Sequence, residues 1–184
     1  MPSMIAVYSS SSDQIPQQYF AAARELGRLM AQRRHGLVFG GGNVGLMNAM
    51  AQELQTGGGR VVGVIPKELK DQDLALDGCT EMIVTDGMRD RKATMEARAD
   101  GFIALPGGFG TLEELLEIIT LKQLRYHAKP IVILNVAGYF DPLLEQFARM
   151  FKERFAKRKF AELYFVTADP AAALDYLERF RTEA

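Results

Sequence analysis

A glycine loop between an apolar run and a helix pattern is the feature that most constrains the fold of this chain. The run 102–105 predicts a buried strand, and Pro106 ends it because proline has no N–H to donate to a sheet. The glycines that let the backbone turn are Gly107, Gly108 and Gly110. Thr111 then begins a pattern typical of an amphipathic helix. This order predicts an anion site, because free N–H groups and the helix dipole both favour a phosphate.

Short apolar runs alternate with helix patterns along the rest of the chain. The expected strands are residues 4–8, 37–39, 61–65, 82–84, 102–105, 131–134 and 164–166. The expected helices are residues 19–34, 44–55, 88–99, 111–125 and 141–155, with a last helix after Asp169. Asp141 and Asp169, each followed by proline, are expected to cap the last two. The order predicts a doubly wound parallel α/β sheet in a single domain, residues 1–184.

Three polar or glycine-rich loops follow expected strands, at residues 9–12, 40–43 and 106–110. Ligands of such sheets bind outside the carboxyl ends of the strands, so we expect these loops to meet at one edge. The residues expected to contact a ligand there include Ser11, Gly41, Gly42 and Asn43. The alternative is that these segments are tight turns with close backbone packing.

Two common nucleotide motifs do not fit. Residues 40–45 match G-x-G-x-x-G formally, but the next strand ends in Pro66-Lys67 where a ribose-binding acidic residue is expected. NAD is therefore disfavoured. No Gly-Lys-Ser/Thr follows either glycine loop, so the phosphate-binding motif of P-loop proteins is absent from the sequence.

Glu114 has two interpretations. Thr111-Leu-Glu-Glu114 has the spacing of a capping box, in which Glu114 reaches back to the Thr111 N–H. The functional interpretation places its carboxylate beside a bound phosphate, where it can act on the sugar of a nucleotide. Spacing alone favours the cap.

Arg91 and Lys92 lie in a basic cluster at the start of an expected helix. Cations oppose the dipole there, so the placement is mildly unfavourable. A solvated surface is one interpretation. Recognition of a phosphate or carboxylate is the other, since arginine offers a bidentate fork, and the unfavourable placement favours it slightly.

Composition excludes several classes of partner. A formal charge of −1 argues against nucleic acid binding, and no apolar run is long enough to span a membrane. Cys79 has no partner for an internal disulfide, and the first residues lack a signal peptide pattern, so we expect a cytoplasmic protein. Two distant histidines and one cysteine give no metal-ligand spacing, so neither a metal nor a cofactor is expected.

The motifs together resemble the Lonely Guy family, the cytokinin riboside 5′-monophosphate phosphoribohydrolases. Residues 106–114 fit its P-G-G-x-G-T-x-x-E motif, and residues 88–92 resemble its M-x-x-R-K motif. The resemblance extends in order from Ile5 over nearly the whole chain. Departures include Ser9-Ser-Ser-Ser12 where the family commonly has Cys-Gly-Ser-Ser.

The resemblance implies a Rossmann-like homodimer that hydrolyses the N-glycosidic bond of a nucleoside monophosphate of the AMP or isopentenyl-AMP type. Free base and ribose 5-phosphate would be the products. Glu114 and Arg91 would be catalytic. The residues that would hold the substrate, chiefly its phosphate, are Lys92, Gly107, Gly108, Gly110 and Thr111. The alternative is a non-catalytic carrier of a nucleotide or of the molybdenum cofactor with the same fold.

Overall fold

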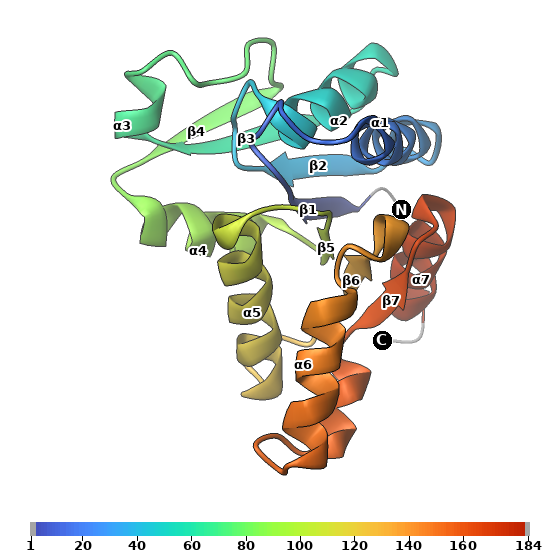
Figure 1. Cartoon of the computed structure of the whole chain (residues 1–184). Helices are drawn as coiled ribbons and strands as arrows, with labels where there is room; N and C mark the ends of the chain where they lie inside the picture. Colours follow the sequence, from blue (N-terminus) through green and yellow to red (C-terminus); the bar gives the residue numbers. More distant parts are fainter. Residues whose placement is uncertain (1–2, 183–184) are drawn as a thin grey trace.

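The computed structural model describes residues 3–182, which form a parallel sheet with helices on both faces (Figure 1). The strands are β1 (Met4–Tyr8), β2 (Gly36–Phe39), β3 (Val61–Pro66), β4 (Glu81–Thr85), β5 (Gly101–Ala104), β6 (Ile131–Leu134) and β7 (Phe165–Thr167). They lie in the order β4-β3-β2-β1-β5-β6-β7, and every neighbouring pair is parallel. The doubly wound parallel sheet is therefore confirmed. The expected domain of residues 1–184 extends at both ends beyond the described range.

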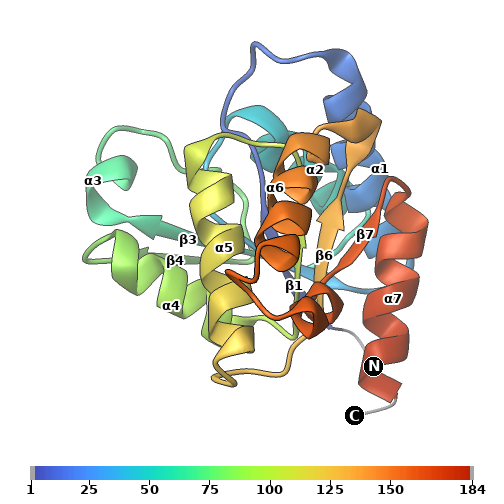
Figure 2. The same cartoon turned by 60° about the horizontal axis from the view of Figure 1, so that its bottom comes forward.

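Helices cover both faces of the sheet. They are α1 (Gln17–Gln32), α2 (Gly45–Thr56), α3 (Lys67–Lys70), α4 (Met88–Arg98), α5 (Phe109–Gln123), α6 (Asp141–Lys152) and α7 (Pro170–Thr182), with 3-10 turns η1 (Val136–Gly138) and η2 (Arg158–Leu163). One face packs against α1, α2 and α7, and the other against α4, α5 and α6 (Figures 1 and 2). None of the helices within residues 3–182 has the length and apolar character needed to cross a membrane.

The strands explain why the sequence shows apolar runs rather than alternation. In β1, Ile5 and Val7 pack into the core on the α1 side, whereas Ala6 and Tyr8 pack on the α5 side. Successive side chains of a strand point to opposite faces, so a sheet covered on both faces needs apolar residues at every position. The edge strand β7 is less buried than the strands at the centre.

The two expected aspartate caps have different outcomes. Asp169 accepts a hydrogen bond from the Ala171 N–H at 2.9 Å, so the cap at the start of α7 is confirmed. The cap at Asp141 is wrong, because α6 begins at Asp141 itself with Phe140 as the residue before it. The Asp141 carboxylate instead accepts a hydrogen bond from Asn135 Nδ2 at 2.7 Å, which fixes the turn after β6.

The strand order reverses between β1 and β5, which are hydrogen-bonded neighbours in the centre of the sheet. From this point the chain winds outward in both directions, so the loops after the two strands diverge to opposite faces. Open α/β sheets bind ligands in the crevice that this divergence leaves. The fold therefore places residues 9–12 and 105–110 at the position where a ligand site is expected.

Candidate active site

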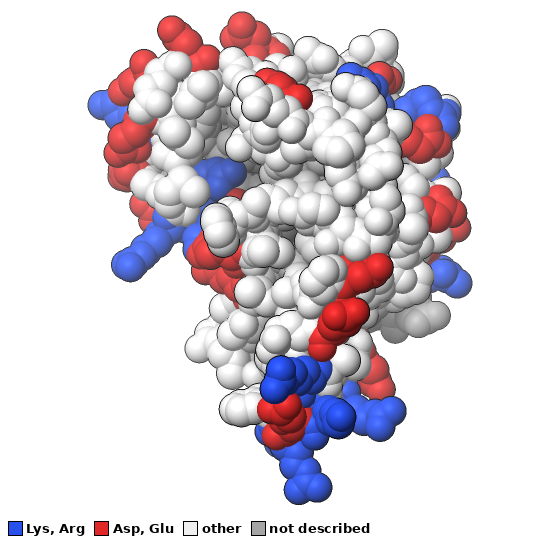
Figure 3. Space-filling view, viewed as in Figure 1, with Lys and Arg blue, Asp and Glu red and all other residues white. Residues whose placement is uncertain are grey.

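A cavity of about 530 Å³ opens at this edge of the sheet. The three loops contribute residues 9–12, Gly40 and Gly42, and residues 108–111 to its wall. The expectation that the loops meet at one edge is confirmed. Helix α4 and the segment after β3 complete the wall, and the space-filling view shows a hollow with basic side chains at its side (Figure 3).

Arg91 and Glu114 form a buried ion pair on the wall of this cavity. Arg91 comes from the first turn of α4, and its Nη1 donates to Glu114 Oε1 at 2.8 Å. Its Nε donates to the backbone carbonyl of Val64 at 3.1 Å, at the end of β3. Each residue is less than 10% exposed. The pair therefore joins α4, α5 and the sheet at one point. The Arg91 guanidinium is oriented by its two hydrogen bonds as well as by charge.

Gly40 makes room for this pair. A Cβ atom at that position would overlap Nη2 of Arg91. The position of a Cβ atom is set by the backbone, so the rotamer of a new side chain would not relieve the overlap. The glycine after β2 therefore serves close packing against a guanidinium, in addition to lining the cavity.

Burial controls the protonation of Glu114. It raises the pKa of the Glu114 carboxyl, and the charge and hydrogen bond of Arg91 lower it by less, so the pKa of Glu114 lies above its usual value. Burial also raises the pKa of the Tyr8 phenol well above its usual value, and the neighbouring Glu114 carboxylate adds to this. The Tyr8 side chain lines the same cavity as a neutral hydroxyl.

The capping-box interpretation of Glu114 is wrong. Helix α5 begins at Phe109 with Gly108 as its N-cap, two residues earlier than the sequence predicted. Thr111 is therefore inside the first turn, and no side chain caps this helix. Glu114 faces Arg91 instead of the helix N-terminus. The early start follows from the glycine loop, whose extended N-cap residue needs no hydroxyl to begin the helix.

The N-terminus of α5 supplies free donors to the cavity. Leu112 is the residue whose N–H bonds back to the Gly108 carbonyl, at 3.1 Å. The preceding N–H groups, from residues 109–111, have no partner within the helix, as at any α-helix start. Because residues 108–111 line the cavity, these donors and the helix dipole favour an anion there.

The glycines of the α5 loop have separate roles. A Cβ at Gly107 would overlap the Thr111 side chain and lie 3.0 Å from the Ser10 nitrogen, so this glycine permits close approach of the loop after β1. Gly108 and Gly110 have open space around their Cα atoms. Gly107 itself does not line the cavity, whereas Gly108, Gly110 and Thr111 do.

Some residues of the loop 40–43 line the larger cavity, and others hold a neighbouring segment in place. Gly42 lines the cavity, but Gly41 and Asn43 do not. Gly41 has a φ of 74° and accepts a hydrogen bond from the Leu76 N–H at 2.8 Å. Asn43 Nδ2 donates to the Asp73 carbonyl at 3.0 Å. These two residues hold the segment after α3 against the cavity. Ser11 lies on the cavity wall with the other serines of its loop.

Lys92 does not line the larger cavity. Its Nζ lies 2.9 Å from Glu117 Oε2 and also donates to Glu113, so it joins α4 to α5. It lines a second cavity of about 250 Å³ between these helices, together with Arg89. Glu114 and Tyr8 line both cavities.

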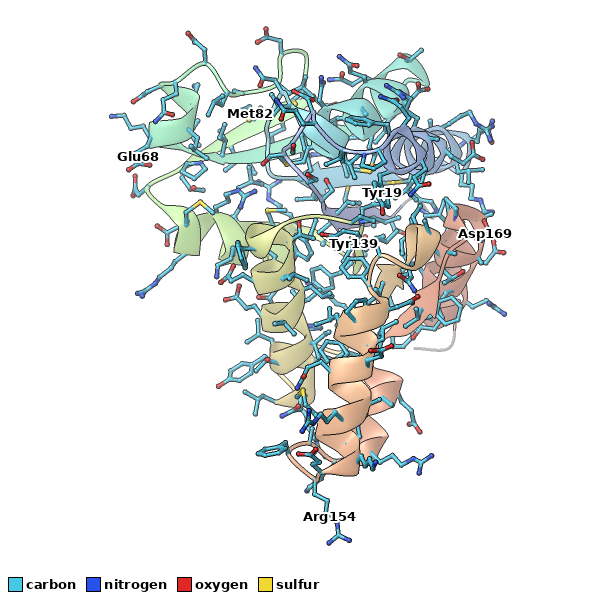
Figure 4. The ribbon with its side chains drawn as sticks, in the orientation of Figure 1. Tyr19, Glu68, Met82, Tyr139, Arg154 and Asp169 are labelled. Atoms are coloured by element: carbon cyan, nitrogen blue, oxygen red, sulfur yellow. The ribbon has the colours of Figure 1, made fainter. Side chains whose placement is uncertain are left out.

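Sequence reasoning assigned no role to several residues of the site. Tyr139, which follows η1, donates its hydroxyl to the Gly107 carbonyl at 2.6 Å and packs beside Tyr19 (Figure 4). The sequence feature that could have indicated a role for Tyr139 is its position just after the expected strand 131–134. Exposed apolar side chains also line the larger cavity, namely Leu69, Met88 and Phe109. Among residues 3–182, no group of three or more His, Cys, Asp or Glu side chains could hold a metal ion.

Comparisons with known proteins give two kinds of similarity. A family described as "Possible lysine decarboxylase" matches residues 47–177. The cytokinin riboside 5′-monophosphate phosphoribohydrolase LOG2 of Arabidopsis thaliana is 39% identical over 176 residues, which are 96% of this chain and 83% of that protein. The probable cytokinin riboside 5′-monophosphate phosphoribohydrolase LOGL2 of Oryza sativa subsp. japonica is 40% identical over 176 residues, 96% of this chain and 72% of that protein.

Among solved structures, the Moco carrier protein from Chlamydomonas reinhardtii superposes with a TM-score of 0.76 over 100% of both chains, at 23% identity. At this identity the likeness shows the fold alone.

Proposed function

The chain belongs to the family of cytokinin riboside 5′-monophosphate phosphoribohydrolases, and we propose that Arg91 and Glu114 carry out hydrolysis of an N-glycosidic bond in its larger cavity. The proposed substrate is adenosine 5′-monophosphate, plain or N6-substituted, and the products are the free base and ribose 5-phosphate. The observation that supports this most is the position of the buried Arg91–Glu114 pair in the same cavity as the free N-terminus of α5.

The phosphate is the proposed anchor of the substrate. The N–H groups of residues 109–111 and the dipole of α5 suit a phosphate, as do the serine hydroxyls across the cavity. Binding energy from this group, remote from the bond that breaks, can hold the ribose against Glu114. Gly108, Gly110 and Thr111 take part directly, whereas Gly107, Gly41 and Asn43 act by shaping the loops. Ser11 and Gly42 complete the proposed binding set.

Glu114 is the proposed catalytic carboxylate. As the C1′–N9 bond breaks, its electron pair goes to the base and positive charge develops on the ribosyl group, as in glycoside hydrolysis. The carboxylate stabilises that charge and takes a proton from the attacking water, whose oxygen bonds to C1′. Glu114 then releases this proton to solvent and the departing base takes one up from solvent, so the carboxylate is regenerated and the reaction consumes one water. Arg91 keeps Glu114 oriented and, being on the cavity wall, can contact the base.

The apolar part of the cavity suits the base. Leu69, Met88 and Phe109 line the cavity and remain exposed, so each can lose exposed area to an adenine ring or to an alkyl group on its N6 atom. Phe109, which is 93% exposed, stands at the first residue of α5 beside the proposed phosphate position. An apolar N6 substituent is therefore compatible with this wall.

Two other functions have less support. Among the described residues no lysine lines the larger cavity, so it offers no amine to which pyridoxal phosphate could attach for a decarboxylase. A carrier of the molybdenum cofactor shares the fold, but the solved carriers are under 25% identical to this chain. A carrier would bind a nucleotide without releasing a base.

Incubation of the purified protein with AMP, isopentenyl-AMP and adenosine, followed by chromatography, tests the proposal. We expect free base from both monophosphates and much slower release from adenosine, because adenosine lacks the anchor. Equal turnover of AMP and adenosine would contradict the proposed role of the phosphate as the anchor of the substrate.

A homodimer in the cytoplasm is the proposed form of the protein. The ends of α5 and α6 project beyond the sheet, with Arg154 at the tip (Figures 1 and 4). Apolar side chains near these ends are exposed, namely Leu124, Tyr126 and Phe155, and a second copy would bury them. The lone thiol of Cys79 is compatible with a reducing compartment. Sedimentation equilibrium tests the dimer, and a monomer at micromolar concentration would contradict it.

A further inference from the structure

Tyr139 lies outside the cavity wall but is bonded to the loop that forms it. Its hydroxyl donates to the Gly107 carbonyl at 2.6 Å, across 32 residues of sequence. The ring packs edge-on against Tyr19 of α1 and against Phe140, with centroid distances of 5.7 and 5.1 Å. The hydroxyl therefore contacts the glycine loop from the segment after β6, independently of α5.

The backbone that carries Tyr139 is itself fixed. Asn135 Oδ1 accepts a hydrogen bond from the Phe140 N–H at 2.7 Å, which closes the turn after β6. Ala137 and Gly138 both have positive φ, at 53° and 70°, so the chain reverses tightly just before Tyr139. Tyr139 is 41% exposed, and its contacts are the two neighbouring aromatic rings and the hydrogen bond of its hydroxyl.

The hydrogen bond to Gly107 has a consequence for Gly108. In a trans peptide the carbonyl and the following N–H point in opposite directions. Holding the Gly107 carbonyl toward Tyr139 therefore directs the Gly108 N–H away from it. Gly108 lines the cavity and Gly107 does not, which favours the cavity as the side that the Gly108 N–H faces.

Neither residue of this peptide has a side chain of its own that could set its orientation, because both are glycine. Glycine populates many backbone conformations, and a Cβ at Gly108 would meet nothing within 4 Å. Pro106, which precedes this peptide, is held by the loop after β1, because the Ser10 N–H donates to the Pro106 carbonyl at 3.2 Å. The Tyr139 hydroxyl is a side-chain group from outside the loop that holds the Gly107–Gly108 peptide, between Pro106 and α5.

We propose that Tyr139 is a positioning residue, whose hydroxyl holds the Gly107–Gly108 peptide so that the Gly108 N–H joins the first turn of α5 in binding the substrate phosphate. The proposal rests on the proposed function for the identity of the anion. It does not rest on turnover, because inorganic phosphate and ribose 5-phosphate bind the same donors whether or not a base is released.

Tyr139→Phe tests this, since it removes the hydroxyl and keeps the ring. We expect the dissociation constants of inorganic phosphate and ribose 5-phosphate, measured by calorimetry, to rise about three- to tenfold, the range for loss of one hydrogen bond. The KM for AMP should rise by the same factor, with kcat changed less than about twofold, because the lost interaction is uniform binding. The matched control is Tyr19→Phe, which keeps the ring contact and should leave all these values unchanged.

Two results would overturn the proposal. One is unchanged phosphate affinity in Tyr139→Phe. The other is an equal loss of affinity for adenosine, which has no phosphate, since that would indicate a general disturbance of the cavity. If the wild-type chain releases no base but Tyr139→Phe still weakens phosphate binding, the proposed function fails and the role of Tyr139 stands.

Discussion

The pKa of Glu114 is the residue property on which the chemistry depends most. A carboxylate can stabilise a ribosyl cation or accept a proton from water only when it is ionised. Burial beside the apolar core opposes ionisation, and the Arg91 guanidinium 2.8 Å away favours it. The effect of burial is the larger, so the pKa of Glu114 is raised although Arg91 stabilises its charged form.

The pH dependence of the reaction follows from this direction. The proposed mechanism needs an ionised Glu114 carboxylate, so it predicts that kcat/KM rises with pH as Glu114 loses its proton. Because the pKa is raised, the midpoint of that rise should lie above about 4.3, the usual value for glutamate. A pH–rate profile with AMP measures it. A midpoint at or below the usual value would show that burial does not dominate in solution.

Gly40 gives a second prediction for single residues. In Gly40→Ala the new Cβ would overlap Arg91 Nη2, so the guanidinium must shift from the position in which it bonds Glu114. We expect a stability loss of about 1–3 kcal/mol, the usual range for overpacking, together with a large loss of kcat. Urea unfolding and AMP turnover measure the two effects. Gly87→Ala is the control, because a Cβ at that position meets nothing. Normal activity in Gly40→Ala would show that Arg91 does not need its present position.

Helices α4 and α5 act together as the unit that carries the pair. Arg91 and Glu114 lie on facing sides of these helices, and Lys92 makes a second connection to Glu113 and Glu117 one turn along. These carboxylates are partly exposed, so water weakens their ion pairs with Lys92. The second connection therefore contributes more to the alignment of the helices than to global stability.

Lys92→Met separates alignment from direct phosphate binding. If Lys92 aligns the helices, we expect kcat to fall severalfold while the dissociation constant of inorganic phosphate stays the same. The stability loss should stay below about 1 kcal/mol, because the carboxylate partners of Lys92 are open to water. Lys152→Met, at an exposed lysine of α6, is the control for removal of a helix ammonium that joins no second helix in the described contacts. A loss of phosphate affinity with unchanged kcat would instead place Lys92 on the phosphate.

The molecule as a whole follows from its apolar pattern. Runs of three to five mostly apolar residues predicted the strands, and their alternation with helix patterns predicted a parallel sheet. The strand order, which places the divergence of the loops between β1 and β5, was not predicted, but a site at the carboxyl edge of the strands was. The glycine loops at 40–43 and 106–110 indicated it independently.

The contacts inside the site were not predictable in the same way. Sequence spacing fixes which residues share a helix face, but not how far the helix is rotated against its neighbour. The pairing of Arg91 with Glu114, and of Lys92 with other carboxylates, depends on that rotation. The start of α5 depends on the conformation of Gly108, and the spacing of Thr111 and Glu114 gave a cap that does not form.

Release of free base from AMP, compared between the wild-type chain and Glu114→Gln, is the measurement that tests the central claim most directly. Glutamine keeps the size of the side chain and an oxygen for Arg91, so AMP should still bind. We expect the wild type to give base and ribose 5-phosphate in equal amounts, and the variant to be about 10²- to 10⁴-fold slower. Glu145→Gln, an exposed glutamate of α6, should keep the wild-type rate. Full activity in Glu114→Gln, or AMP bound by the wild type with no base released, would contradict the claim.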